Sequence, residues 1–172
     1  MIEQDTTMIR IGQGIGLSQR GDRDAARRLF EEIWNDIGGE SGDPLHRCAL
    51  AHAMADVQDD LHHELTWDLR ALDAADLVTD ERATQAGVTN PVRGFFPSLH
   101  LNLGECYRKL GELDRAREHL QRGRAAVHAL EDDGYGRMIK KGLDSLAERL
   151  SLAGPQDDQS LTQEADVRGV GS

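Results

Sequence analysis

The sequence predicts an all-α protein in which pairs of helices stack into an α-solenoid. Apolar residues recur at three- and four-residue spacing through most of the 172 residues, which is the periodicity of one helix face. Short breaks containing glycine or aspartate divide this pattern into segments of helix length. Apolar residues make up only 38% of the chain and aromatic residues 4%. That composition suits the thin apolar seams of a stack better than one deep core.

The first two helices are expected over 8–17 and 25–34, where apolar residues keep helical spacing. The break Gln19-Arg20-Gly21-Asp22 separates them. Gly38-Gly39 ends the second helix, because glycine is favoured just after a helix C-terminus.

A third helix is expected from Asp43-Pro44 to Val57, because aspartate is a good N-cap and proline fits the first turn. Asp59-Asp60 forms the following turn. The fourth helix then carries a predicted apolar stripe of four leucines: Leu61, Leu65, Leu69 and Leu72.

The helical pattern lapses over 76–96, where Gly87, Asn90-Pro91 and Gly94 are typical of a loop. Thr79-Asp80-Glu81 could cap a short helical turn within it. Three further helices are expected over 97–110, 113–130 and 135–150.

A repeat signature occurs in Leu103-Gly104-Glu105-Cys106-Tyr107, followed by Gly111 and Ala116. It resembles the tetratricopeptide repeat, which places L-G-x-x-Y on its first helix and A-x-x-x-F on its second. Small residues lie where the two helices approach, and large residues fill the space around them. The chain departs from the family pattern where His100 replaces a tryptophan and Leu120 a phenylalanine.

The first helix pair matches the same unit more loosely, and the middle pair matches it least. In the middle pair, His52 and Glu64 occupy places for small residues. The resemblance implies a right-handed α-solenoid of about three repeats and a capping helix, forming a domain over 1–151. The expected repeats are about 7–40, 43–77 and 97–130, the cap is 134–151, and a disordered acidic tail is expected over 152–172.

The resemblance also implies that the first helices of the pairs line a groove that binds a protein or peptide. Ten candidate residues follow from the groove-facing positions and the 78–96 insertion: His46, Ala49, Ala53, Asp56, Arg93, Phe96, Leu101, Asn102, Glu105 and Arg108. An ordinary solvated face is the alternative for the groove positions. For Phe96, and for Phe95 beside it, the alternative is a hydrophobic staple that anchors the insertion.

Composition and motifs limit the other function classes. A formal charge of −11 argues against nucleic acid and anionic membranes. It would attract a basic segment of a partner, and the alternative is that the acidic surface serves only solubility. No cofactor, metal or catalytic motif is expected, and Cys48 and Cys106 are expected to be buried free thiols. We therefore expect a soluble, cytoplasmic interaction protein rather than an enzyme. A small-molecule or signal-peptide sensor with the 78–96 insertion as a lid is the alternative, and a homodimer is open in either case.

Overall fold

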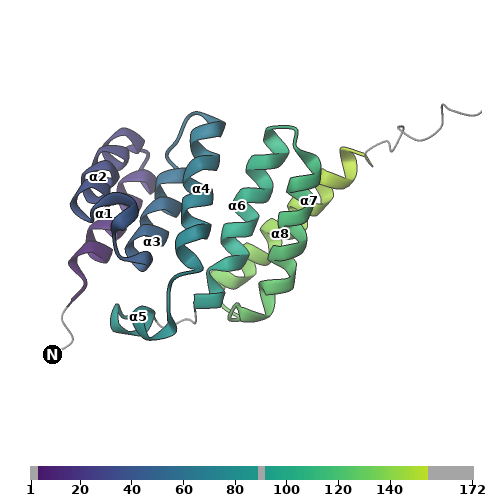
Figure 1. The fold of residues 1–172 in the computed structure, drawn as a ribbon. Coiled ribbons are helices and arrows are strands. Elements are labelled where there is room, and N and C mark those ends of the chain that lie inside the picture. The colour runs from purple at the N-terminus through teal and green to yellow at the C-terminus, as the bar shows by residue number, and fades with distance from the viewer. Residues whose placement is uncertain (1–3, 89–91, 155–172) are drawn as a thin grey trace, which may run out of the picture.

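The computed structural model describes residues 4–88 and 92–154, and this part of the chain is all-helical. Its α-helices are α1 (Thr6–Gln19), α2 (Arg23–Asp36), α3 (Pro44–Ala55), α4 (Leu61–Ala75), α5 (Asp80–Gln85), α6 (Phe96–Lys109), α7 (Leu113–Ala126) and α8 (Gly134–Leu152). Three short 3-10 turns are η1 (Gly39–Ser41), η2 (Val92–Gly94) and η3 (Val127–Ala129). Figure 1 shows the pairs α1–α2, α3–α4 and α6–α7 following one another in a row, with α8 beside the last pair and α5 below the row. The predicted fold class is confirmed, because adjacent helices pack in pairs as in a solenoid.

The two helices of each pair are joined by short turns that the local sequence specifies. Gly21 and Gly111 have φ of 90° and 81°, a left-handed conformation that glycine adopts without a steric penalty. Asp22 then caps α2 by accepting a hydrogen bond from the Ala25 N–H at 3.1 Å. Asp60 caps α4 in the same way, so in the first two pairs the turn also starts the second helix.

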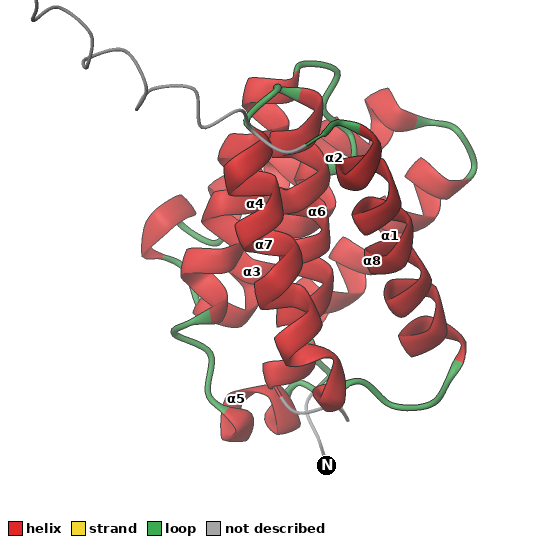
Figure 2. Cartoon of the chain, turned by 90° about the vertical axis from the view of Figure 1, so that its right-hand side faces the viewer, coloured by secondary structure: helices red, strands yellow, loops and turns green. Residues whose placement is uncertain are grey.

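Close helix packing depends on the small residues of the repeat pattern. A Cβ atom added to Gly104 would lie 2.6 Å from Cδ2 of the buried Leu146, and one on Gly14 would collide with the Phe30 ring. Ala116 is fully buried in the core cluster that joins α6, α7 and α8. The end-on view in Figure 2 shows these helices layered closely together.

The buried face of α4 differs from the predicted leucine stripe. Asp68 is 1% exposed, whereas Leu69 is 37% exposed. The helix packs against α3 on one side and α6 on the other, with Trp67 turned to the α3 side and Leu65 to the α6 side. Its buried arc is therefore wider than a single stripe, and Asp68 lies within that arc.

The insertion between α4 and α6 is attached to the first two repeats through Arg82 of α5. Its Nε donates to Asp43 Oδ2 at 2.9 Å and its Nη2 to Asp5 Oδ2 at 3.0 Å. These carboxylates are the N-caps of α3 and α1. His46 Nε2 lies 2.8 Å from the same Asp5 oxygen. We call Asp5, Asp43, His46 and Arg82 the α5 clip.

The cap α8 covers α6 and α7 and starts and ends close to the predicted bounds. The predicted sixth helix is shorter than expected, because α7 ends at Ala126 and continues as η3. Residues 155–172 of the predicted tail lie outside the described residues, as do Asn90-Pro91 of the insertion.

Candidate functional site

An apolar pocket of about 230 Å³ is formed on the inner side of the stack by the first helices of all three pairs. The insertion adds Val88 and Phe95 to its wall, and α8 adds Tyr135. Its other lining residues are Met8, Ile15, Leu45, Cys48, Ala49, His52, Ser98 and Leu99. Because helices from both ends of the stack share one pocket, the stack curves around it, and this inner side is the groove.

Polar groups adjoin the apolar pocket at His52, toward the C-terminal end of α3. Asn102 Nδ2 of α6 lies 3.5 Å from His52 Nδ1, so the two side chains meet across the groove. Burial lowers the pKa of His52. Asp56 follows at the C-cap of α3, and part of its surface reaches solvent. Neighbouring atoms reduce the hydration of its carboxyl group, and this desolvation raises its pKa.

Asp68 lies beneath these groups on α4. Both carboxylate oxygens are buried, and neither has a hydrogen-bond partner. Burial, followed by the negative charges of Asp56 and Glu64, raises the pKa of Asp68 to about 8. The Asn102 amide lies near enough to favour the ionised form of both Asp56 and Asp68, but its position does not satisfy hydrogen-bond geometry to either Asp68 oxygen. We call His52, Asp56, Asp68 and Asn102 the polar floor of the groove.

The next turn of α6 carries charges that are already paired. Arg108 Nε donates to Glu105 Oε2 at 2.9 Å, and Arg149 of α8 binds the other oxygen of Glu105. Lys109 Nζ lies 3.8 Å from Glu64 Oε1. Arg23 attracts Asp56 and Lys109 attracts Asp68. Each of these cations is bound to another carboxylate, Arg23 to Asp59 and Lys109 to Glu64, so neither forms a direct ion pair with the polar floor.

The structure brings five of the sequence-derived candidates to this groove. Ala49 lines the apolar pocket, Asp56 and Asn102 belong to the polar floor, and Glu105 and Arg108 form an adjacent ion pair. Sequence reasoning passed over Asp68, although an aspartate amid leucines at helical spacing was a visible signal.

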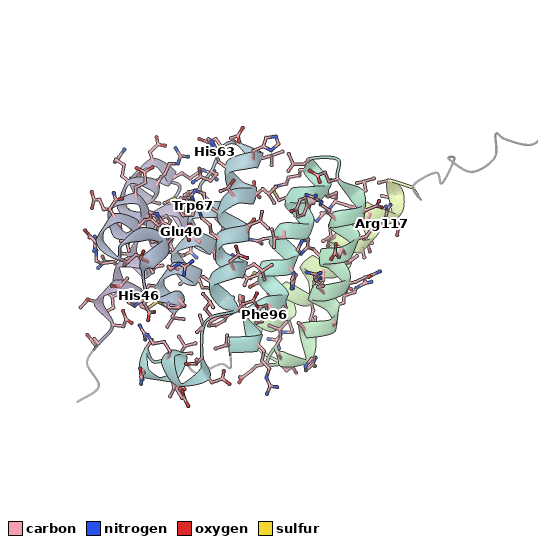
Figure 3. The ribbon with its side chains drawn as sticks, in the orientation of Figure 1. Glu40, His46, His63, Trp67, Phe96 and Arg117 are labelled. Carbon is pink, nitrogen blue, oxygen red and sulfur yellow. The ribbon has the colours of Figure 1, made fainter. Side chains whose placement is uncertain are left out.

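The remaining candidates are placed elsewhere or are engaged in packing. His46 belongs to the α5 clip, and Arg93 is exposed on η2. Ala53 is buried in the core of the first two pairs. Phe96 stacks on His100 with ring centroids 6.3 Å apart, and Leu101 packs on Gly142 of α8. Figure 3 shows His46 and Phe96 at well-separated places, near α5 and at the start of α6.

A second polar pair is buried between α6 and α7. Nδ1 of His100 and Nδ1 of His119 lie 3.0 Å apart, so one nitrogen donates and the other accepts. Burial, followed by the neighbouring His119, lowers the pKa of His100 to about 4. Tyr107 stacks on His119 with ring centroids 5.4 Å apart. His100 of this pair takes up interior space where the family pattern has a tryptophan.

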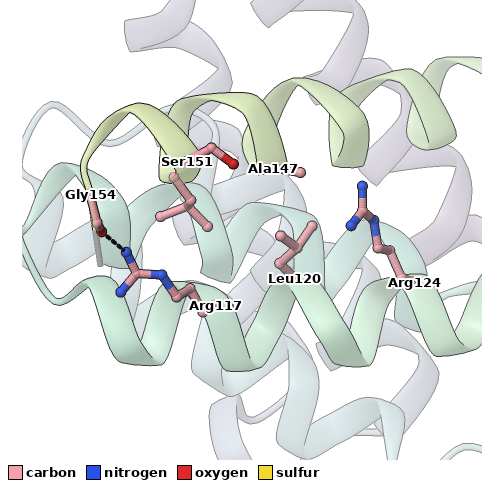
Figure 4. Close-up of a pocket in the computed structure, with 7 residues that line it drawn as sticks. Arg117, Leu120, Arg124, Ala147, Ser151 and Gly154 are labelled. Atoms are coloured by element: carbon pink, nitrogen blue, oxygen red, sulfur yellow. Dashed lines mark hydrogen bonds between the residues drawn. The ribbon is translucent and has the colours of Figure 1, made fainter. Parts of the chain in front are cut away.

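Other features of the described residues do not form a comparable site. A hollow of about 410 Å³ lies between α7 and α8 (Figure 4), but Arg117 at its edge already donates to the Gly154 carbonyl, and Arg124 contacts Asp144. Over 4–88 and 92–154, no group of three His, Cys, Asp or Glu side chains is placed to hold a metal ion. Cys48 and Cys106 are free and buried, as predicted. No helix in these segments is long and apolar enough to cross a membrane.

Comparison with known proteins gives a family but no individual relative. The family model of the tetratricopeptide repeat matches residues 8–32 and 97–122, which are the helix pairs α1–α2 and α6–α7. No curated protein and no solved structure matches the chain. Such repeats generally mediate protein–protein interaction. The two matched pairs lie on both sides of the α3–α4 pair in one continuous stack, and this arrangement supports a tetratricopeptide-repeat protein.

Proposed function

We propose that this protein is an interaction module, rather than an enzyme, that binds an extended segment of a partner protein in its groove. The apolar pocket carries this proposal, because a pocket of about 230 Å³ matches one or two apolar side chains of a peptide. Drug-sized ligands generally occupy larger pockets of about 300–1,000 Å³. The polar floor beside the pocket supplies groups that could fix the orientation of a bound segment, and the overall charge of −11 favours a segment with basic residues.

One observation favours the alternative of a small-molecule sensor. Val88 and Phe95 of the insertion form part of the pocket wall, so the insertion could act as a lid over a small apolar ligand. The same two residues could equally close over an apolar side chain of a peptide. Peptide binding therefore needs a test that a small ligand would not satisfy.

Selection of random dodecapeptides on the immobilised full chain tests the proposal. Ala49→Trp places a large side chain in the pocket and should weaken the selected peptides at least about tenfold, a loss of about 1.4 kcal/mol. Ala125→Trp is the matched control, because Ala125 is exposed on α7. Thermal melting checks that both variants fold. Peptides that bind equally to both variants would refute the groove as the binding site.

A further inference from the structure

The feature that the groove-binding proposal leaves unexplained is the Asp68 carboxyl group. A buried ionisable side chain normally has a hydrogen-bond or ion-pair partner, because an unsatisfied buried polar group is costly. Asp68 is 1% exposed, and neither of its oxygens has a partner. Its position in the packed interior of α4 would suit a leucine, and Leu69 one residue later is instead left 37% exposed.

The charges nearest to Asp68 are negative. Asp56, at the end of α3, and Glu64, one turn earlier on α4, both raise its pKa. The remaining ionisable groups that influence or border it are His52, Cys106 and Lys109. Lys109 contacts Glu64, and burial keeps His52 and Cys106 uncharged near neutral pH, since it lowers the pKa of the histidine and raises that of the thiol. Arg23 acts on Asp56 from α2 but is hydrogen-bonded to Asp59. The described residues thus concentrate acidic groups here, and the nearby cations are engaged by other carboxylates.

We propose, on the basis of the groove-binding function above, that the polar floor receives a lysine or arginine side chain of the partner. The cation pairs with Asp56, which solvent reaches, and the Asn102 side-chain oxygen accepts a further hydrogen bond from it. Asp68 beneath them releases its proton to solvent when the cation arrives. One proton leaves as one positive charge enters, so the charge of the polar floor is conserved.

The apolar pocket and the polar floor are adjacent, because His52 belongs to both. The recognised segment therefore combines an apolar side chain for the pocket with a basic side chain a short distance along the chain. The acidic groups of the polar floor favour a basic side chain of the partner over an acidic or a neutral one. An acidic side chain would meet Asp56 and Asp68, and a neutral one would leave both carboxyl groups unpaired.

Binding of peptide pools to the immobilised full chain tests this assignment. Each pool consists of random nonapeptides with one fixed central residue: lysine, arginine, norleucine or glutamate. Norleucine is the control, because it keeps the aliphatic chain of lysine without the charge. We expect the lysine or arginine pool to bind at least about tenfold more tightly than the norleucine pool. The double variant Asp56→Asn/Asp68→Asn should abolish that preference, whereas Asp73→Asn, on the exposed side of α4, should keep it.

Calorimetry of the best lysine peptide measures the proton directly. At pH 7, titrations in phosphate and Tris buffers should show the release of close to one proton per peptide, and Asp68→Asn should show almost none. Equal binding of the lysine and norleucine pools would overturn cation binding by the polar floor while leaving the groove proposal in place. A preference that survives the double variant, or a peptide that binds without proton release, would also overturn it. Failure of every pool to bind would instead overturn the groove function itself.

Discussion

Replacement of Asp68 by asparagine should change the pH dependence of stability in a defined direction. In the unfolded chain this carboxyl group has a pKa of about 3.8, whereas burial raises the pKa to about 8 in the fold. Between these values the native state holds a proton that the unfolded chain releases. Rising pH therefore favours unfolding, and the stability present below pH 3.8 is progressively lost as the pH approaches 8. Asparagine keeps the shape of the side chain and cannot ionise.

The magnitude follows from the difference between the two pKa values. Each unit corresponds to about 1.4 kcal/mol, so the wild type should lose about 3 kcal/mol of unfolding free energy relative to Asp68→Asn between pH 5 and pH 7. Contributions from the other titrating groups largely cancel in this difference. The neutral amide also avoids the buried charge, so Asp68→Asn should be the more stable protein at pH 7.

Urea unfolding of both proteins at pH 5, 6 and 7, followed by circular dichroism, measures this difference. Asp73→Asn, which removes an exposed carboxyl group from the same helix, is the matched control. A gap between the wild type and Asp68→Asn that stays constant across the three pH values would refute the reasoning. A wild type that gains stability on going from pH 5 to pH 7 relative to the variant would refute it as well.

Four other substitutions test the packing, the pH response and the attachment of the insertion. Gly104→Ala should destabilise the protein by about 1–2 kcal/mol in urea unfolding, because the added Cβ would lie 2.6 Å from the enclosed Leu146. Gly12→Ala is the matched substitution with no atom within 4 Å, and should stabilise by up to about 1 kcal/mol through helix propensity. Relative to His100→Phe, the wild type should lose about 2 kcal/mol between pH 7 and pH 5, because the pKa of His100 is lowered from 6.5 to about 4 and acid favours the unfolded state; parallel pH profiles would contradict this. Arg82→Gln removes the guanidinium of the α5 clip and should speed amide hydrogen exchange in α5 at least about tenfold with little change elsewhere, whereas unchanged exchange would show that other contacts hold the insertion.

Local rules were sufficient to predict most of the fold. Helix starts are set by N-cap aspartates such as Asp22 and Asp43, which act within one turn of sequence. The turn at Gly111 and the close approach at Gly104 have steric causes that the residue type alone reveals. For this reason the repeat pattern indicated the stack before any contact between distant residues was known.

The functional candidates were harder to predict, because they depend on contacts between helices. His46 has groove-like spacing on α3, but the α5 clip engages it through Asp5, which lies 41 positions away. Ala49 and Ala53 are one turn apart, yet one lines the pocket and the other lies in the core. Spacing along one helix gives the face of a residue but not the partner that will cover that face.

Asp68 shows how a departure from the packing pattern can point to binding. The sequence of α4 offers Leu69 for burial, but α4 packs between α3 and α6 with Asp68 buried and the leucine partly exposed. A carboxyl group in that position destabilises the free chain, and asparagine or leucine there should not. A partner that brings a cation to Asp56 restores part of this lost stability, but only when Asp68 can ionise. The substitution that strengthens the fold should therefore weaken cation recognition, and a purely structural role for Asp68 would not couple the two effects with opposite signs.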